Sequence, residues 1–139
     1  MHSARLLPLV LFIPALLAAC TTSKGSVEQN ARHMAYQIER IHFDPNTRPL
    51  TADNIRSMAV FLGQFYDMGK KDRAAGLTQA QAQQRADLIS NNETSPFTPG
   101  TQKTTFINRA YDADQPDKRI AIMKAGAIKS YWDGYNGRP

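Results

Sequence analysis

The chain has 139 residues and a formal net charge of +5, from 17 lysines and arginines against 12 aspartates and glutamates. Charges of both signs are interspersed, which is typical of a solvated surface and argues against a nucleic-acid-binding protein. The length suits one domain, and the single cysteine excludes an intramolecular disulfide.

Residues 1–19 have the organisation of a secretory signal peptide. Arg5 supplies a positive charge, and the apolar stretch over residues 6–17 is shorter than the about 20 residues of a membrane-spanning helix. Small residues then lead to the only cysteine, in the order Leu17, Ala18, Ala19, Cys20. This tetrapeptide resembles the lipobox of bacterial lipoproteins. The resemblance implies recognition of residues 17–19 by a signal peptidase, cleavage before Cys20 and a lipid, with its palmitate-like acyl chains, on that cysteine. A plain secreted protein with an incidental cysteine is the alternative.

A lipid on Cys20 would join the protein to a membrane covalently, because two or three acyl chains suffice for stable anchoring. Thr21 follows the cysteine, at the position where an acidic residue retains lipoproteins in the inner membrane of enterobacteria. By that resemblance Thr21 predicts the cell outer membrane, with the protein facing the periplasm or the cell surface. Residues 20–25 then form the lipidated cysteine and a polar tether of under roughly 20 Å.

Apolar residues at three- and four-residue steps predict helices through the domain that spans residues 26–139. The first covers residues 26–41, with a capping box at Ser26 and Gln29. Its expected buried face consists of Val27, Ala31, Met34, Ile38 and Ile41.

Two further helices are delimited by their capping residues. Thr51 is the expected N-cap of the second helix, and Gly76 is its expected C-terminal cap. Thr78 and Gln81 match a capping box at the start of a third helix, rich in glutamine and alanine. Its thin apolar face has Ala82, Ala86 and either Leu88 or Ile89.

The C-terminal third begins with a long loop over residues 91–102, which contains Ser-Pro and Thr-Pro-Gly. A short helix is expected within residues 103–112, and a final helix from Pro116 to the glycines Gly134 and Gly137. Its expected face is Ile120, Met123, Ala127, Tyr131 and Tyr135. The predicted fold class is all-α: a small single domain of four or five short helices behind a cleaved signal peptide and short tether.

Two helical stretches each place two aromatic residues beside an aspartate and a glycine. They are Phe65-Tyr66-Asp67 with Gly69, and Tyr131-Trp132-Asp133 with Gly134. We expect the glycines to let two helices approach closely and the aromatic rings to fill the core between them. The alternative is an exposed aromatic patch that docks a partner, for which Trp132 and Tyr135 are the candidate interaction surface.

Residues for catalysis or metal binding are sparse. His33, His42 and Asp44 are the candidates for metal or acid–base chemistry, and their spacing matches no metal-binding or catalytic motif. We therefore expect no enzyme activity, no metal, no cofactor and no small-molecule substrate. A site that forms only in the fold is the alternative.

Several strings of the mature region resemble small enterobacterial lipoproteins of the exclusion-protein family. They are ARHMAYQIER, FDPNTRPLT, FLGQFYDMGKKDRAAGLT, QPDKR and YWDGYNGRP. The family takes its name from plasmid entry exclusion, which blocks redundant DNA transfer into a cell that already carries the plasmid. The resemblance implies a non-enzymatic envelope protein and transfers no catalytic residue. Three interpretations stay open: an envelope protein that acts by protein interaction, an accessory or structural outer-membrane lipoprotein in lipid or assembly contact, and a periplasmic enzyme.

Overall fold

The computed structural model describes residues 25–42, 50–91, 103–106, 109–112 and 115–139, and side chains outside residues 103–112. The expected signal peptide, Cys20, Thr21, Asp44 and residues 92–102 of the loop expected over residues 91–102 lie outside this part of the chain. The described residues form four helices and a two-stranded hairpin: α1 (Ser26–Ile41), α2 (Thr51–Ala74), α3 (Gln79–Asn91), β1 (Lys103–Phe106), β2 (Arg109–Asp112) and α4 (Pro116–Tyr135). The fold is thus the small helical domain that the sequence predicts.

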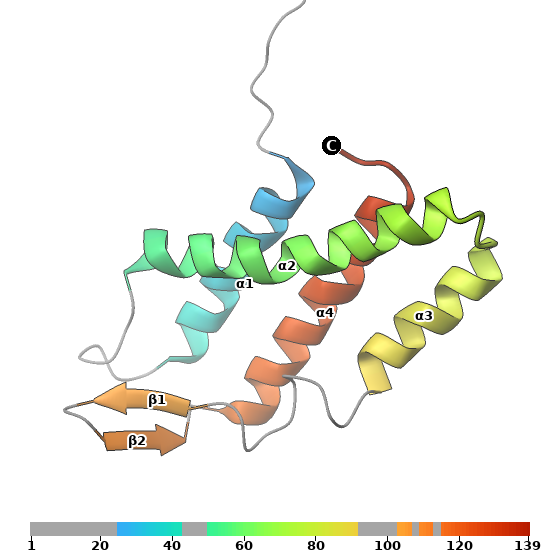
Figure 1. The fold of residues 1–139 in the computed structure, drawn as a ribbon. Helices are drawn as coiled ribbons and strands as arrows, with labels where there is room; N and C mark the ends of the chain where they lie inside the picture. Colours follow the sequence, from blue (N-terminus) through green and yellow to red (C-terminus); the bar gives the residue numbers. More distant parts are fainter. Residues whose placement is uncertain (1–24, 43–49, 92–102, 107–108, 113–114) are drawn as a thin grey trace, which may run out of the picture.

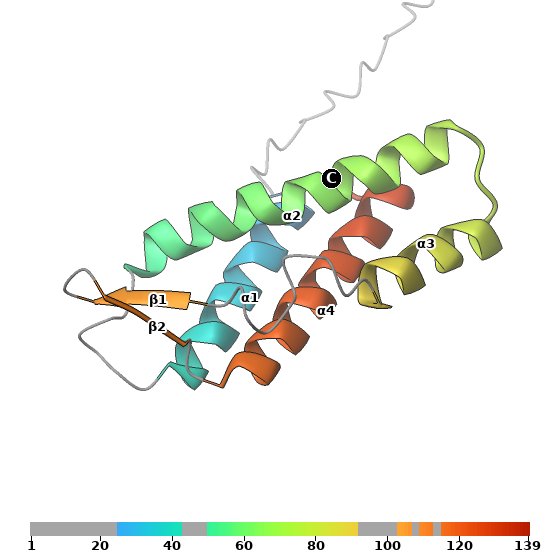
Figure 2. The same ribbon diagram turned by 60° about the horizontal axis from the view of Figure 1, so that its bottom comes forward.

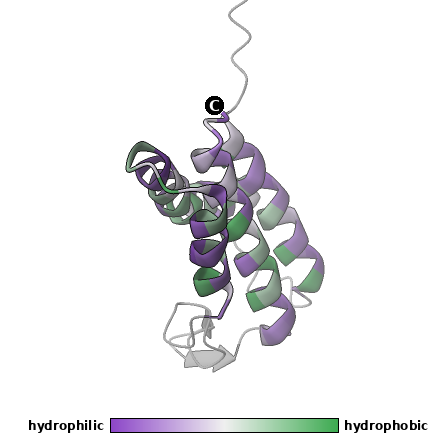
Figure 3. Cartoon of the chain, turned by 90° about the vertical axis from the view of Figure 1, so that its right-hand side faces the viewer, coloured by the Kyte–Doolittle hydropathy of each residue, from purple (hydrophilic) through white to green (hydrophobic). Residues whose placement is uncertain are grey.

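The core lies where α1, α2 and α4 meet. Helices α1 and α4 run antiparallel side by side, α2 crosses both of them, and α3 packs along α4 (Figures 1 and 2). The start of α1 and the C-terminus lie at the same end of this helical body, and the hairpin lies near the start of α4 (Figure 1). Hydrophilic and hydrophobic segments alternate along the helices, as expected when each helix buries one face (Figure 3).

The predicted face of α1 is confirmed at its centre, where Ala31, Met34 and Ile38 are buried. The predicted capping box is wrong. Gly25 is the N-cap, and Ser26 is the first helical residue with no side-chain capping bond. The Ser26 amide instead donates to the carbonyl oxygen of Pro139 at 2.6 Å. A carbonyl of the C-terminal tail therefore accepts from an amide of the first helical turn that has no partner within the helix.

The turn between α2 and α3 follows its sequence signals. Gly76 has a φ of +79°, and its amide and that of Leu77 donate to the last turn of α2 at 3.0 and 3.1 Å. The Thr78 capping box is reciprocal: Thr78 N–H donates to Gln81 Oε1 at 2.9 Å, and Gln81 N–H to Thr78 Oγ1 at 3.3 Å.

At the start of α2, the expected N-cap Thr51 is wrong by one residue. Helix α2 already begins at Thr51, and Leu50 precedes it as N-cap.

The short helix expected within residues 103–112 is wrong. This segment forms the antiparallel pair β1–β2, in which Lys103 pairs with Asp112 and Phe106 with Arg109. Only residues 107–108 connect the strands, a common loop length for a hairpin. Threonines 104 and 105 are β-branched and favour strands. Apolar spacing over ten residues does not separate a helix from a hairpin.

Helix α4 is confirmed from Pro116 onward. Its predicted stripe is buried throughout: Ile120, Met123, Ala127, Tyr131 and Tyr135. Gly137, with a φ of +69°, lies just beyond the helix as expected for a C-terminal cap. Gly134 does not end the helix but lies buried within it. Within the part of the chain described, no helix combines the length and apolar character needed to cross a bilayer.

Candidate functional site

Helices α2 and α4 touch backbone to backbone at two glycines. A Cβ on Gly69 would collide with the carbonyl oxygen of Tyr131, and a Cβ on Gly134 would collide with that of Tyr66. The two aromatic–aspartate–glycine stretches of the sequence are therefore the two sides of one helix crossing. This confirms that the glycines serve close approach, because only a residue without Cβ fits between the two helices.

The C-terminal aromatic residues form one cluster of rings. Tyr131 is fully buried and Tyr135 is 3% exposed, and their ring centroids are 6.4 Å apart. Trp132 is partly buried and meets both rings edge to face, with centroid distances of 5.7 and 5.5 Å. Tyr135 is thus a core residue, as its place on the helical stripe predicts, and the alternative that it belongs to an exposed interaction surface is wrong. Its hydroxyl donates to the Leu77 carbonyl at 2.6 Å, so it holds the start of α3.

Asp72 links three helices. Tyr131 Oη donates to Asp72 Oδ2 at 2.9 Å, and Arg85 Nε of α3 donates to the same oxygen at 3.2 Å. Burial, together with the hydrogen bond to Asp72 and its negative charge, raises the pKa of Tyr131 above the usual tyrosine range. The sequence signal for this site is an aspartate in register with the buried positions Met58, Leu62 and Gly69 of α2.

Asp133 forms a second buried polar cluster at the end of α4. Its carboxylate accepts from Asn30 Nδ2 at 2.8 Å, from Arg138 at 3.0 Å and from Lys129 at 3.4 Å. Burial acts to raise the pKa of Asp133, but the hydrogen bonds from Asn30 and Arg138 and the charge of Lys129 outweigh it. The pKa is therefore lowered. This cluster joins α1, α4 and the C-terminal tail, and is structural in character.

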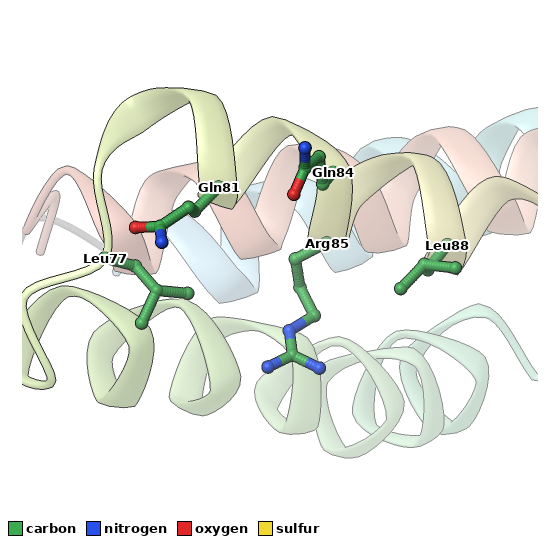
Figure 4. A pocket seen from close by; sticks show the side chains of 5 residues that line it. All are labelled: Leu77, Gln81, Gln84, Arg85 and Leu88. Atoms are coloured by element: carbon green, nitrogen blue, oxygen red, sulfur yellow. The ribbon is translucent and has the colours of Figure 1, made fainter.

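An open groove runs along α3 on the side that faces α2. It holds about 210 Å³ and is lined by Leu77, Gln81, Gln84, Arg85 and Leu88. Arg85 reaches from α3 toward α2, and Leu77 and Leu88 lie on either side of it (Figure 4). Leu88 is 64% exposed, whereas Ile89 is buried, which decides between the two residues that the sequence left open for the core face. The groove thus combines exposed leucine with polar side chains.

The histidines contribute no site that can be assigned from the described residues. His33 is exposed on α1, His42 is partly buried beyond the end of the same helix, and Asp44 lies outside the described residues. Among the side chains that the structure describes, no three histidine, cysteine or acidic residues gather closely enough to hold a metal ion.

Comparison of the chain with protein-family models, with curated proteins and with solved structures finds no match.

Proposed function

We propose that this chain is a non-enzymatic bacterial envelope lipoprotein, anchored in the outer membrane by lipid on Cys20, that acts by binding another protein. The observation that carries this proposal is the run of residues 17–20, placed after a short apolar segment and a few residues ahead of a folded helical domain. Covalent lipid needs only a sequence that the processing enzymes recognise, so the anchor requires no pocket in the domain.

The anchor is tested by labelling cells with palmitate. The wild-type chain should incorporate the label and partition with membranes, whereas Cys20→Ser should incorporate none and leave a soluble or uncleaved chain. Equal incorporation into both would overturn the lipoprotein assignment.

The groove along α3 is the surface that we assign to the protein partner. Its lining mixes two leucines with two glutamines and an arginine, and mixed composition around an apolar anchor is typical of protein interfaces. The 64% exposure of Leu88 makes it the best anchor of this lining. An exposed leucine flanked by polar side chains therefore supports a protein contact.

Photo-crosslinking tests the groove directly. A photoreactive residue at position 88 should crosslink a discrete envelope protein in living cells. The control position is 60 on α2, because Val60 is similarly exposed but does not line the groove. A crosslinked product at position 60 and none at position 88 would show that the groove is not the contact surface.

Entry exclusion, the activity of the family that the sequence resembles, is the specific activity that we propose. Recipient cells that express the wild-type chain should take up a conjugative plasmid less often than cells without it. Leu88→Asp and Cys20→Ser should each restore transfer, and Val60→Asp should not. Unchanged transfer into wild-type recipients would refute exclusion. A crosslink from position 88 to an assembly protein would then favour the accessory role.

A further inference from the structure

Two hydrogen bonds join the C-terminal tail to the end of the domain from which the proposed tether leaves. The Ser26 amide donates to the Pro139 carbonyl at 2.6 Å, and the Tyr66 hydroxyl donates to the Arg138 carbonyl at 2.6 Å. The start of α1, the C-terminal tail and Tyr66 of α2 therefore lie close together. Because the tether joins the chain at Gly25, this end is the part of the domain nearest to Cys20 in the sequence.

Four exposed basic side chains contact residues of this end, and we call them the basic rim: Lys70, Arg73, Lys129 and Arg138. The Lys70 ammonium lies 5.8 Å from the centre of the Tyr66 ring, and the Arg73 guanidinium lies 5.2 Å from the centre of the Tyr135 ring. These contacts place the α2 cations beside the C-terminal tail.

The other two cations, Lys129 and Arg138, both pair with Asp133. Their side chains are 57% and 65% exposed, whereas the Asp133 side chain is 5% exposed. The carboxylate is therefore hidden behind the cations, and the positive charge faces the solvent. Of the exposed or half-exposed acids in the neighbouring turns, Glu28 pairs with Arg32 at 3.1 Å and Asp67 precedes Lys70 on α2. With Asp133 these acids number three, and with Arg32 the cations of this end number five, so the end carries a positive balance.

We propose that the basic rim binds the anionic phospholipid headgroups of the membrane that holds the Cys20 lipid, so that the domain rests on the bilayer by its tether end. This inference rests on the proposed lipid anchor, because a tether of residues 20–25 spans under roughly 20 Å and keeps the rim close to the headgroups. Electrostatic attraction acts over about 8–10 Å at physiological salt, a distance within the maximum length of this tether.

The test uses residues 20–139 with Cys20→Ser. This chain contains every element of the described fold, and it carries no covalent lipid, so any vesicle binding comes from the protein itself. It should bind vesicles of phosphatidylcholine mixed with phosphatidylglycerol, bind vesicles of phosphatidylcholine alone much more weakly, and dissociate as salt is raised. Each cation near an anionic surface contributes about a fivefold change in partitioning, so Lys70→Gln with Arg73→Gln should weaken binding roughly 25-fold. Both side chains are exposed, and circular dichroism should show an unchanged helix content.

The matched control removes the same charge from the opposite end of the helices. Arg40 lies in the last turn of α1 and Lys118 in the first turn of α4, and both are exposed. Arg40→Gln with Lys118→Gln should weaken vesicle binding far less than the rim variant does. If both variants lost vesicle binding equally, binding would depend only on net charge, and the proposal that the basic rim binds the membrane would be wrong. If the wild-type chain takes up palmitate in cells but the Cys20→Ser chain fails to bind anionic vesicles, the rim is likewise overturned. If the wild-type chain takes up no palmitate, only the proposed anchor is removed.

Discussion

The helix crossing at Gly69 and Gly134 yields the sharpest stability prediction. A Cβ on Gly69 would lie 2.7 Å from the backbone nitrogen of Tyr135, where ordinary contacts are 3.4–4 Å, and closer still to the Tyr131 carbonyl. Both contacted atoms belong to the backbone of α4, so no side chain can rotate away and the helices must separate. Overpacking of this kind costs about 1–3 kcal/mol, and a rigid neighbour points to the upper end. Helix propensity returns about 1 kcal/mol, so Gly69→Ala should destabilise the domain by about 2 kcal/mol.

Gly63 supplies a control in the same helix. A Cβ there would meet nothing within 4 Å, so Gly63→Ala should keep only the propensity gain of about 0.5–1 kcal/mol. Thermal melting followed by circular dichroism should place Gly69→Ala below the wild type by about 8 °C and Gly63→Ala at or above it. Gly134→Ala should resemble Gly69→Ala, because its Cβ would lie 2.8 Å from the carbonyl carbon of Tyr66. Equal melting temperatures of Gly69→Ala and Gly63→Ala would refute the backbone contact at Gly69.

Three further measurements address the core, the buried charge and the sorting signal. Tyr131→Ala should cost about 3–5 kcal/mol of unfolding free energy and Trp132→Ala less, because only Tyr131 is fully buried; equal melting of Tyr131→Ala and wild type would contradict this. The pKa of Asp133 is lowered in the folded state, so its stabilisation is present above about pH 4 and lost as the pH falls through the folded pKa. An acid titration should therefore destabilise the wild type more than Asp133→Asn, which should already be less stable at neutral pH. Finally, Thr21→Asp should move the protein from the outer-membrane to the inner-membrane fraction, and a wild type that already fractionates with the inner membrane would remove the basis for the proposed location.

The helices and most of their ends could be read from the sequence, because their signals are local. Alanine, methionine and isoleucine at helical spacing place Ala31, Met34 and Ile38 on one face. The turn at Gly76 and the capping box at Thr78 depend on residues within one turn of each other. The sequence pattern of a few neighbouring residues therefore predicts them. The lipobox at Cys20 is local in the same way and remains a prediction for labelling to test.

Tertiary structure alone decided which residues meet across the chain. Ser26 matches a capping box, but its amide is taken by Pro139, more than a hundred positions away. Residues 103–112 match a helical spacing, but pair as strands. Helical spacing places Tyr135 on the buried stripe of α4, but only the fold brings its hydroxyl to the Leu77 carbonyl. The physical reason is the same in each case. A hydrogen bond needs a partner from a distant segment, and the spacing of residues along the chain does not show which segment supplies it.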